Sequence, residues 1–396
     1  MNTKSKFALS AGIIIAVIIS TQYGDNGVFF FNLIADNNNN NNDESQNSNS
    51  NSNSNSNSNS NSNNNDNGVS SRTRTLRIGY FPNLNHAQAV IGLQQDGDFQ
   101  KTLNANSSDT NKGVRIESYV FNAGPSAIEA LFGGQIDVAY VGPNPAINGY
   151  LASSGQGLKI ISGAASGGAS FVVRNDSGIN SVNDLGGKKF ASPQLGNTQD
   201  VALRKYLVDN GYNTTDNGGN VTIVPVTPAD ILTLMLKKEI DGAWVPEPWA
   251  TRLVKEANGR IFVDERELWP PDGKFVTANI IARTDYLNEN PEIIKQFLAA
   301  HINQTNWIND NKEKAMEAFN IALKNITGRT IPEDELRDAF SRLEVTYDPV
   351  QKSLFEQASN AYDQGFLAGV QSSKPDLSGI YDLSILNQVL KEKDNT

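Results

Sequence analysis

The ten residues IDVAYVGPNP, Ile136 to Pro145, decide how this chain folds. The apolar run predicts a buried strand, the glycine ends it, and the two prolines begin a helix at once. The same junction of strand end, small or polar residue and helix-opening proline recurs at residues 123–126, 227–230 and 246–249. Strand and helix therefore alternate, which predicts α/β architecture with mostly parallel sheets.

The alternation extends from about Thr75 through most of the chain. The roughly 320 residues after a low-complexity tract exceed what one core usually holds, so two lobes are expected. Strands are expected at 76–80, 114–121, 136–141, 158–162, 170–174, 188–191, 221–226, 240–245, 260–263 and 276–282. Helices are expected at 87–94, 126–132, 145–152, 198–210, 229–238, 248–257, 292–309, 312–325, 333–343, 350–368 and 383–391.

The N-terminal part has a different composition. Phe7 to Ile19 is apolar and too short for a usual membrane span, as in a signal sequence. No clear cleavage site follows it, so a signal peptide and an uncleaved anchor both remain open, and either one exports the rest. Asn and Ser make up nearly all of residues 36–71, which predicts a flexible spacer. We expect a signal or anchor segment at 1–35 and a spacer at 36–74.

Composition excludes several kinds of site. The chain has no cysteine, so it can form neither disulfides nor thiolate metal sites. It has two histidines, His86 and His301, too few for a histidine-rich metal site. A net charge of -10 argues against a nucleic-acid partner. No P-loop, Ser-His-Asp arrangement or catalytic carboxylate pair stands out. We therefore expect no catalytic residue, no metal and no cofactor.

The repeated junctions have a chemical consequence. They place helix N-termini at the carboxyl ends of parallel strands, which is the edge where open α/β sheets bind ligands. Helix N-termini offer unpaired N–H groups and partial positive charge, so they hold anions without lysine or arginine. At any single junction, ordinary helix capping explains the same residues.

Five segments resemble one known family in their order and spacing. They are LRIGYFP at 76–82, AGPSAIEAL at 123–131, GQIDVAYVG at 134–142, SVNDLGGKKFA at 181–191 and DGAWVPEPW at 241–249. The chain is similar here to the sulfonate/nitrate/taurine family of ABC-importer solute-binding proteins. That resemblance implies the α/β, two-lobed type II periplasmic-binding fold, with a mostly parallel sheet flanked by helices in each lobe.

The resemblance also implies the domain organisation. Lobe 1 would contain 75–166 and, after a return crossover, the C-terminal helices within 265–396. Lobe 2 would be 167–264. Crossovers would lie near 162–170 and 264–277, and the lobes would close on the ligand by hinge motion.

By position, the resemblance implies these ligand-facing residues: Asn83, Asn85, His86, Gly124, Pro125, Ser126, Gly142, Pro143, Asn144, Ser166, Gly167, Asn197, Thr198, Gln199, Trp244, Glu247 and Trp249.

Several of these residues allow two interpretations. His86 is either a hydrogen-bond donor to an oxyanion or a capping histidine. The 197–199 side chains are oxyanion donors, local helix caps, or both. Glu247 is either a cap-region carboxylate or an acceptor for a ligand amine, which would favour a zwitterion such as taurine, or a heterocycle. Trp244 and Trp249 could wall the cleft, and Trp244 equally suits a core.

The function implied is that of an extracytoplasmic ABC-importer receptor at the cell surface or in a periplasm-like space. It would bind a small organic anion, with an aliphatic sulfonate or taurine-like ligand first and nitrate or bicarbonate next. Its partners would be a permease with its cytoplasmic ATPase and the membrane, through the N-terminal segment, and it would be a monomer. Alternatives are a receptor for a thiamine-pyrimidine-like heterocycle, a surface adhesin or sensor, and a fold-related biosynthetic enzyme. An enzyme is not expected, because the thiamine-pyrimidine synthases use a cysteine-rich motif that this chain lacks.

Overall fold

The computed structural model describes residues 21–23, 29–31, 74–94, 97–105, 113–367 and 373–395. The chain divides into two compact units, residues 1–71 and 72–396. In the first unit, β1 (Thr21–Tyr23) and β2 (Phe29–Phe31) pair antiparallel. The apolar run of the expected signal or anchor segment lies outside the described residues. So does the expected spacer, apart from its last residue, which already belongs to a strand.

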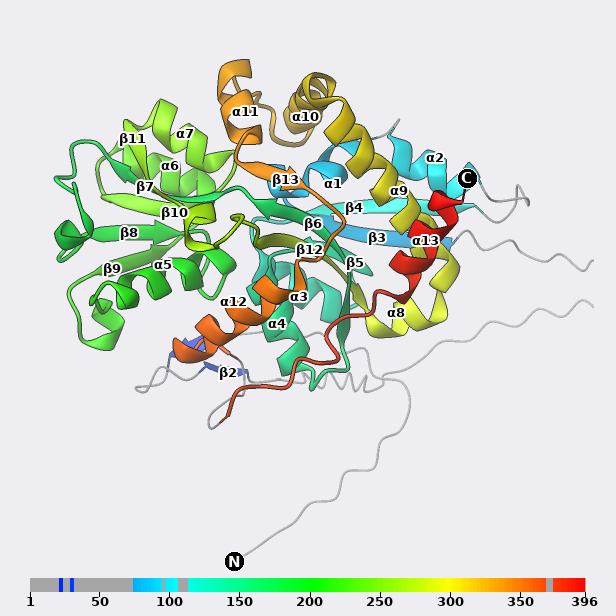
Figure 1. Cartoon of the computed structure of the whole chain (residues 1–396), viewed down its shortest axis with the longest axis horizontal. Coiled ribbons are helices and arrows are strands. Elements are labelled where there is room, and N and C mark those ends of the chain that lie inside the picture. Colours follow the sequence, from blue (N-terminus) through cyan, green and yellow to red (C-terminus); the bar gives the residue numbers. More distant parts are fainter. Residues whose placement is uncertain are drawn as a thin grey trace, which may run out of the picture. The chain divides into compact units, whose positions relative to one another are not determined.

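The second unit contains two sheets, each with its own helices (Figure 1). Within the described residues, six strands form the sheet of lobe 1 in the order β13-β6-β12-β5-β3-β4. Their bounds are β3 (Arg74–Tyr80), β4 (Val114–Val120), β5 (Val138–Val141), β6 (Leu158–Gly167), β12 (Val276–Arg283) and β13 (Leu343–Val345).

The sheet of lobe 2 is built from strands in the middle of the chain. Within the described residues its order is β11-β7-β10-β8-β9. The bounds are β7 (Ala169–Arg174), β8 (Lys189–Ser192), β9 (Thr222–Pro225), β10 (Gly242–Pro246) and β11 (Gly259–Asp264).

The expectation of mostly parallel sheets is wrong, because both sheets are mixed. In lobe 1, β3 runs parallel to β4 and β5, but β12 runs antiparallel to β5 and β6. In lobe 2, β8 runs parallel to β9 and β10, but β7 runs antiparallel to β10 and β11. The physical reason is the path of the chain between the lobes. The strands β7 and β12 lie on this path, and each enters its sheet antiparallel to a strand of the strand–helix repeats.

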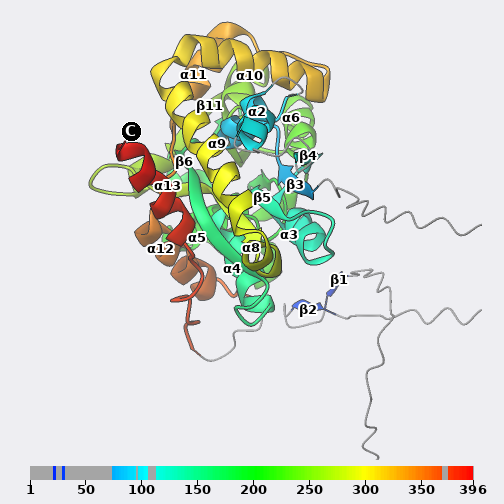
Figure 2. The ribbon, with the colours of Figure 1, turned by 90° about the vertical axis from the view of Figure 1, so that its right-hand side faces the viewer.

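Helices cover both faces of each sheet (Figures 1 and 2). In lobe 1, one face packs against α1 (Ala87–Gly92), α2 (Asp98–Ala105), α8 (Thr284–Glu289), α9 (Pro291–Asp310), α10 (Lys312–Thr327), α11 (Glu333–Phe340) and α13 (Ser384–Asp394). The other face packs against α3 (Gly124–Phe132), α4 (Pro143–Ala152) and α12 (Gln351–Asp363). In lobe 2, α5 (Thr198–Asp209) lies on one face, and α6 (Pro228–Leu236) and α7 (Trp249–Glu256) lie on the other.

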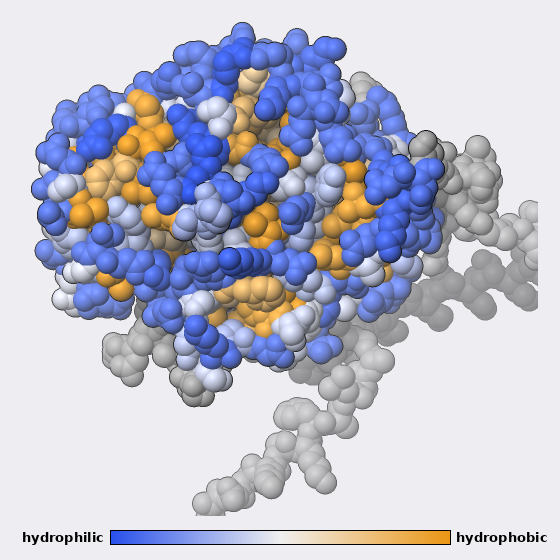
Figure 3. Space-filling view, viewed as in Figure 1, coloured by the Kyte–Doolittle hydropathy of each residue, from blue (hydrophilic) through white to orange (hydrophobic). Residues whose placement is uncertain are grey.

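The cores follow from these layers. Each fully buried side chain of the size of Leu or Phe stabilises the fold by about 1.5–3 kcal/mol relative to exposure. Trp244 is fully buried in lobe 2, where its ring stacks on Phe171 with the centroids 5.5 Å apart. The outer surface is mostly hydrophilic on the face that Figure 3 shows, with apolar side chains in separate patches.

The chain passes between the lobes twice. β6 leads directly into β7 through Gly167 and Gly168, which have φ values of +77° and +75°. Such positive φ values suit glycine, so the sequence permits a sharp turn here. The return runs from the end of β11 through a short 3-10 helix, Glu265–Leu268, to β12.

The structure departs from the expected helices at several places. The helix expected at 333–343 ends at Phe340, and β13 follows and pairs with β6. The helix expected at 350–368 ends at Asp363. Helices α2 and α8 were not expected, because both are short and lack a helix-opening proline at their first residue.

Candidate ligand site between the lobes

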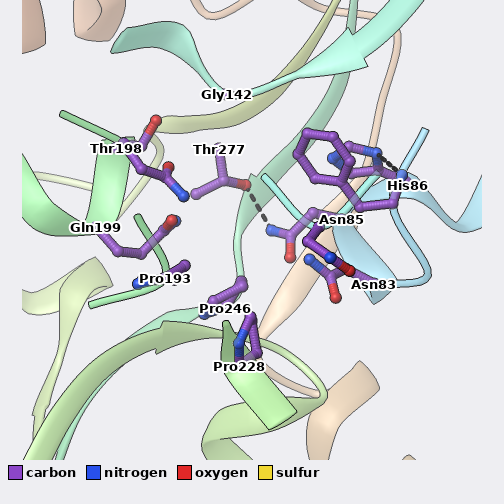
Figure 4. Close-up of a pocket in the computed structure, with 13 residues that line it drawn as sticks. Asn83, Asn85, His86, Gly142, Pro193, Thr198, Gln199, Pro228, Pro246 and Thr277 are labelled. Atoms are coloured by element: carbon purple, nitrogen blue, oxygen red, sulfur yellow. Dashed lines mark hydrogen bonds between the residues drawn. The ribbon is translucent and has the colours of Figure 1, made fainter. Parts of the chain in front are cut away.

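A pocket lies where the two lobes meet, at the carboxyl ends of their parallel strands (Figure 4). Its empty space is about 380 Å³, which includes open solvent at its mouth. Lobe 1 contributes the residues after β3, β4 and β5 and one residue of β12: Phe81, Asn83, Asn85, His86, Asn122, Gly142 and Thr277. Lobe 2 contributes the residues after β8 and β9 and the end of β10: Pro193, Asn197, Thr198, Gln199, Pro228 and Pro246.

The first turn of α5 brings hydrogen-bond donors to the pocket. Asn197 is the N-cap residue, but its side chain makes no capping bond. The backbone N–H groups of Thr198, Gln199 and Asp200 have no acceptor within the described residues. Thr198 and Gln199 line the pocket, so unpaired N–H groups and the positive end of the helix dipole lie at the edge of the space between the lobes.

Asp200 sits in this first turn but does not offer free negative charge to the pocket. Its Oδ1 accepts from the Ser192 hydroxyl at 2.7 Å. Its Oδ2 accepts from the Gly196 N–H at 3.0 Å and from Nε of Arg204 at 3.1 Å. The carboxylate is fully buried and neutralised by the arginine, so it fixes the loop before α5 rather than facing a ligand.

Two buried polar atoms of the pocket lack partners within the described residues. One is the Thr198 hydroxyl, whose residue is 2% exposed, and the other is Oδ1 of Asn85, whose residue is 3% exposed. A buried polar atom without a partner costs about 1–3 kcal/mol. A ligand that bonds to both atoms would remove this cost, which makes the pocket a candidate binding site.

His86 presents a neutral donor. The Phe81 N–H donates to its Nδ1 at 3.1 Å, so the ring proton lies on Nε2. Complete burial lowers the pKa of His86 to about 3, and the imidazole is uncharged at neutral pH. Its ring stacks on Phe81 with the centroids 4.4 Å apart. Within the described residues Nε2 has no hydrogen-bond partner, so it is available to a ligand.

A small hydrogen-bond network connects the pocket to the two segments where the chain passes between the lobes. Nδ2 of Asn85 donates to the Thr277 hydroxyl at 2.9 Å (Figure 4). It also donates to the Gly167 carbonyl at 3.1 Å. The Thr277 hydroxyl in turn donates to the same Gly167 carbonyl at 2.7 Å. Both crossovers are thereby bonded to one side chain that also reaches the ligand space.

Direct contacts join the two lobes across the cleft. The Leu84 N–H donates to the Glu247 carbonyl at 3.0 Å, and Nε1 of Trp249 donates to Oδ1 of Asn83 at 3.0 Å. The Arg342 guanidinium, which follows α11 of lobe 1, lies 3.1 Å from the Glu247 carboxylate of lobe 2. We call this contact the interlobe ion pair.

The structure brings together seven of the residues predicted from sequence. Those that line the pocket are Asn83, Asn85, His86, Gly142, Asn197, Thr198 and Gln199. Gly124, Pro125, Ser126, Pro143 and Asn144 lie at the starts of α3 and α4 but do not line it, and neither do Ser166 and Gly167 at the crossover. Prolines at the first and third positions of α4 also remove two of its N–H donors, so α5 offers more donors than α4.

Three predicted side chains have other roles. Trp244 does not wall the cleft, because it is buried in lobe 2 and donates to Glu265 at 2.8 Å. Glu247 is no acceptor for a ligand amine, because its carboxylate binds Arg342 and accepts from the Thr251 N–H at 3.0 Å. Trp249 does not line the pocket either; it bonds to Asn83 and lies under the Arg252 guanidinium.

Six residues that line the pocket were not predicted from the sequence. They are Phe81, Asn122, Pro193, Pro228, Pro246 and Thr277. Pro228 and Pro246 belong to the repeated junctions, which were interpreted as donor sites although a proline ring presents an apolar face. Thr277 belongs to β12, and no local pattern indicates that this strand returns to the pocket.

Within the described ranges, no helix is long and apolar enough to cross a membrane. The same residues contain no group of three or more His, Cys, Asp or Glu arranged to hold a metal ion.

Comparison with known proteins identifies relatives. The sequence profile of the NMT1-like family matches residues 70–323. A binding protein of Brucella abortus is 28% identical over 205 residues, which are 52% of this chain and 61% of that protein. The match therefore spans less than two thirds of the Brucella protein. The taurine-binding periplasmic protein of Escherichia coli is 24% identical over 301 residues, covering 72% of this chain and 90% of that protein.

A solved structure shares the fold. The alkanesulfonate-binding protein of Xanthomonas axonopodis pv. citri superposes with a TM-score of 0.59 at 19% identity, covering 74% of this chain and 94% of that one. At this identity the likeness shows the fold alone, which is the periplasmic-binding-protein fold with two helix-flanked sheets.

Proposed function

Because the chain belongs to the NMT1-like family, we propose that it is the solute-binding receptor of an ABC importer. In this proposal the two lobes close on a small organic anion and the closed form delivers it to a permease. An aliphatic sulfonate is the leading ligand class, taurine-like compounds included, and nitrate or bicarbonate comes next. The names of relatives support the general class, since they are binding proteins rather than enzymes.

One observation carries the choice of an anion. The first turn of α5 has unpaired N–H groups, and its residues Thr198 and Gln199 line the interlobe pocket together with the neutral His86. The Thr198 hydroxyl there also has no partner. This is an oxyanion-binding arrangement built from dipoles rather than from formal charge. It needs no metal and no cofactor.

The remaining parts of the proposal concern the setting of the receptor. We place lobe 1 at 75–166 and 265–396, lobe 2 at 167–264, and an N-terminal segment and spacer before them. The N-terminal segment would tether a monomeric receptor to the outer face of a membrane, at the cell surface or in a periplasm-like space. Fractionation of cells that express the full chain, with and without residues 1–35, tests this placement.

The experiment that tests the function is a binding screen. Ethanesulfonate, taurine, nitrate, bicarbonate and a thiamine-type pyrimidine are added to the purified protein, and thermal unfolding is followed. A ligand that binds the folded state at a hundredfold excess over Kd stabilises it by about 2.7 kcal/mol, which shifts the midpoint by several degrees. A shift with an anion supports the proposal. A shift with the pyrimidine alone would keep the receptor but replace the ligand class, and no shift at all would favour an adhesin or sensor.

A further inference from the structure

We infer that the ligand is a monoanion with a short apolar body that carries no cationic group, and that a neutral hydroxyl at its far end improves the fit. This inference deepens the proposed function and depends on it. It separates the leading ligands, because taurine carries an ammonium group and its hydroxyl analogue, isethionate (2-hydroxyethanesulfonate), does not.

The charge of the lining residues supports the first half. The residues that line the pocket include no Asp, Glu, Lys or Arg, and His86 is neutral. The donors at the first turn of α5 offset one negative charge. A second negative charge would meet only neutral groups, so the pocket suits a monoanion.

No anionic side chain lines the pocket to offset the charge of an ammonium ion. The nearby carboxylates of Asp200 and Glu247 are buried and already paired with Arg204 and Arg342. An aromatic face is the other common partner of a buried cation, but one face of Phe81 is stacked on the imidazole of His86. An ammonium enclosed by the closed lobes would therefore lose its water without gaining an opposite charge.

The unpartnered acceptor indicates what the ligand should offer instead. Oδ1 of Asn85 is buried and receives no hydrogen bond within the described residues. It lies in lobe 1, whereas the α5 donors lie in lobe 2, so the ligand can reach both with its two ends (Figure 4). A hydroxyl donates to this amide oxygen without bringing a charge into the pocket.

Three prolines supply the apolar side. Pro193, Pro228 and Pro246 lie together along one side of the pocket in Figure 4, below Thr198 and Thr277. Their rings carry no N–H donor and would contact methylene groups. Nitrate and bicarbonate have no apolar part to cover these rings, so a short alkyl chain is the better match.

The decisive experiment compares taurine with isethionate on the full-length protein, kept in mild detergent, by isothermal titration calorimetry at pH 7. The two sulfonates have almost the same size and differ in one terminal group. We expect taurine to bind at least about 30-fold more weakly than isethionate, the usual scale for an unpaired buried charge. We expect ethanesulfonate to lie between them. Taurine binding as tightly as isethionate would overturn the inference, and so would nitrate binding more tightly than any sulfonate.

A variant tests the charge argument directly. Asn83→Asp keeps the oxygen that accepts from Trp249 and adds a negative charge on the side opposite α5. It should reduce the preference for isethionate over taurine by about tenfold or more. The control is Asn217→Asp, an exposed site with the same change of charge, which should leave the ratio unchanged. An unchanged ratio in Asn83→Asp, with its unfolding midpoint preserved, would contradict the inference.

The outcomes separate this inference from the proposed function. If no sulfonate and no inorganic anion binds, the anion receptor fails and the inference fails with it. If sulfonates bind without discrimination against the ammonium group, the receptor stands and only the inference fails.

Discussion

Replacing Arg342 by methionine should weaken ligand binding by opening the lobes. Nη1 of Arg342 lies 3.1 Å from Oε1 of Glu247 and also donates to the Thr251 hydroxyl at 2.8 Å. Glu247 is fully buried and the Arg342 side chain is 20% exposed, so little solvent screens the pair. Removing one partner of a buried pair costs about 3–5 kcal/mol when the other charge stays buried.

The measurable effect should be smaller than that upper figure. In the variant, opening the cleft returns water to the Glu247 carboxylate, and this relief limits the penalty on the closed form. With about 2–3 kcal/mol lost from the closed form alone, the ratio of open to closed ligand-free protein should rise roughly 30- to 160-fold, and Kd should rise by at most this factor. Calorimetric titration with the tightest sulfonate measures Kd, and small-angle X-ray scattering of the ligand-free protein should show a larger radius of gyration.

Two further variants make this prediction specific. Arg337→Met removes an equal charge from an ion pair on the surface of lobe 1, with its side chain 50% exposed, and should leave Kd unchanged. Adding Glu247→Gln to Arg342→Met removes the unpaired charge and should recover most of the lost affinity. A Kd within threefold of the wild-type value in Arg342→Met, together with unchanged scattering, would refute the role assigned to the interlobe ion pair.

Other predictions concern the pocket, a buried acid and the N-terminal unit. Thr198→Val removes an unpartnered hydroxyl and should raise Kd about tenfold. The control Thr233→Val, at an exposed position, should leave Kd unchanged. Equal Kd values for the wild type and Thr198→Val would show that this hydroxyl does not bind the ligand. Burial raises the pKa of Glu265 to about 7, whereas the pKa of this carboxyl in the unfolded chain is about 4.5. The folded protein therefore keeps the proton over a pH range in which the unfolded chain has lost it, and its stability falls as the pH rises from about 4.5 to 7. From pH 5 to pH 8 the wild type should lose about 2.5 kcal/mol of unfolding free energy relative to Glu265→Gln in urea titrations, and parallel pH curves would contradict this. Deleting residues 1–71 should preserve both Kd and the thermal midpoint, since residues 72–396 form a separate compact unit; aggregation would show that the boundary is misplaced.

The sequence predicts the pocket to the extent that local patterns define it. Strand–helix junctions place Asn85, Gly142 and Thr198 at strand ends, and strand ends meet at the edge of a sheet whatever the rest of the chain does. The two-lobed α/β fold is confirmed for the same reason. The direction of the crossover strands follows from the path between the lobes, which has no local signature, and so the mixed sheets were missed.

The predicted role of a side chain is wrong where its hydrogen-bond or ion-pair partner is distant in the sequence. Glu247 follows a strand and precedes a helix, which resembles a ligand-facing position. Its partner Arg342 lies 95 residues later, after a helix of the other lobe. Along its strand, Trp244 alternates with the neighbouring side chains between the two faces of the sheet, but this alternation does not tell which face a helix covers. In the structure, α5 and the 3-10 helix that begins at Glu265 enclose Trp244.

Gly142 has an ordinary backbone, with φ at -69°, so its own conformation does not require glycine. A methyl group at this position would come within 2.4 Å of the Thr198 hydroxyl oxygen of the other lobe. The constraint therefore exists only while the lobes touch, and an open protein would tolerate alanine without strain. Alanine at this position would therefore leave the folding of each lobe intact and strain only the contact between Gly142 and Thr198 in the closed arrangement.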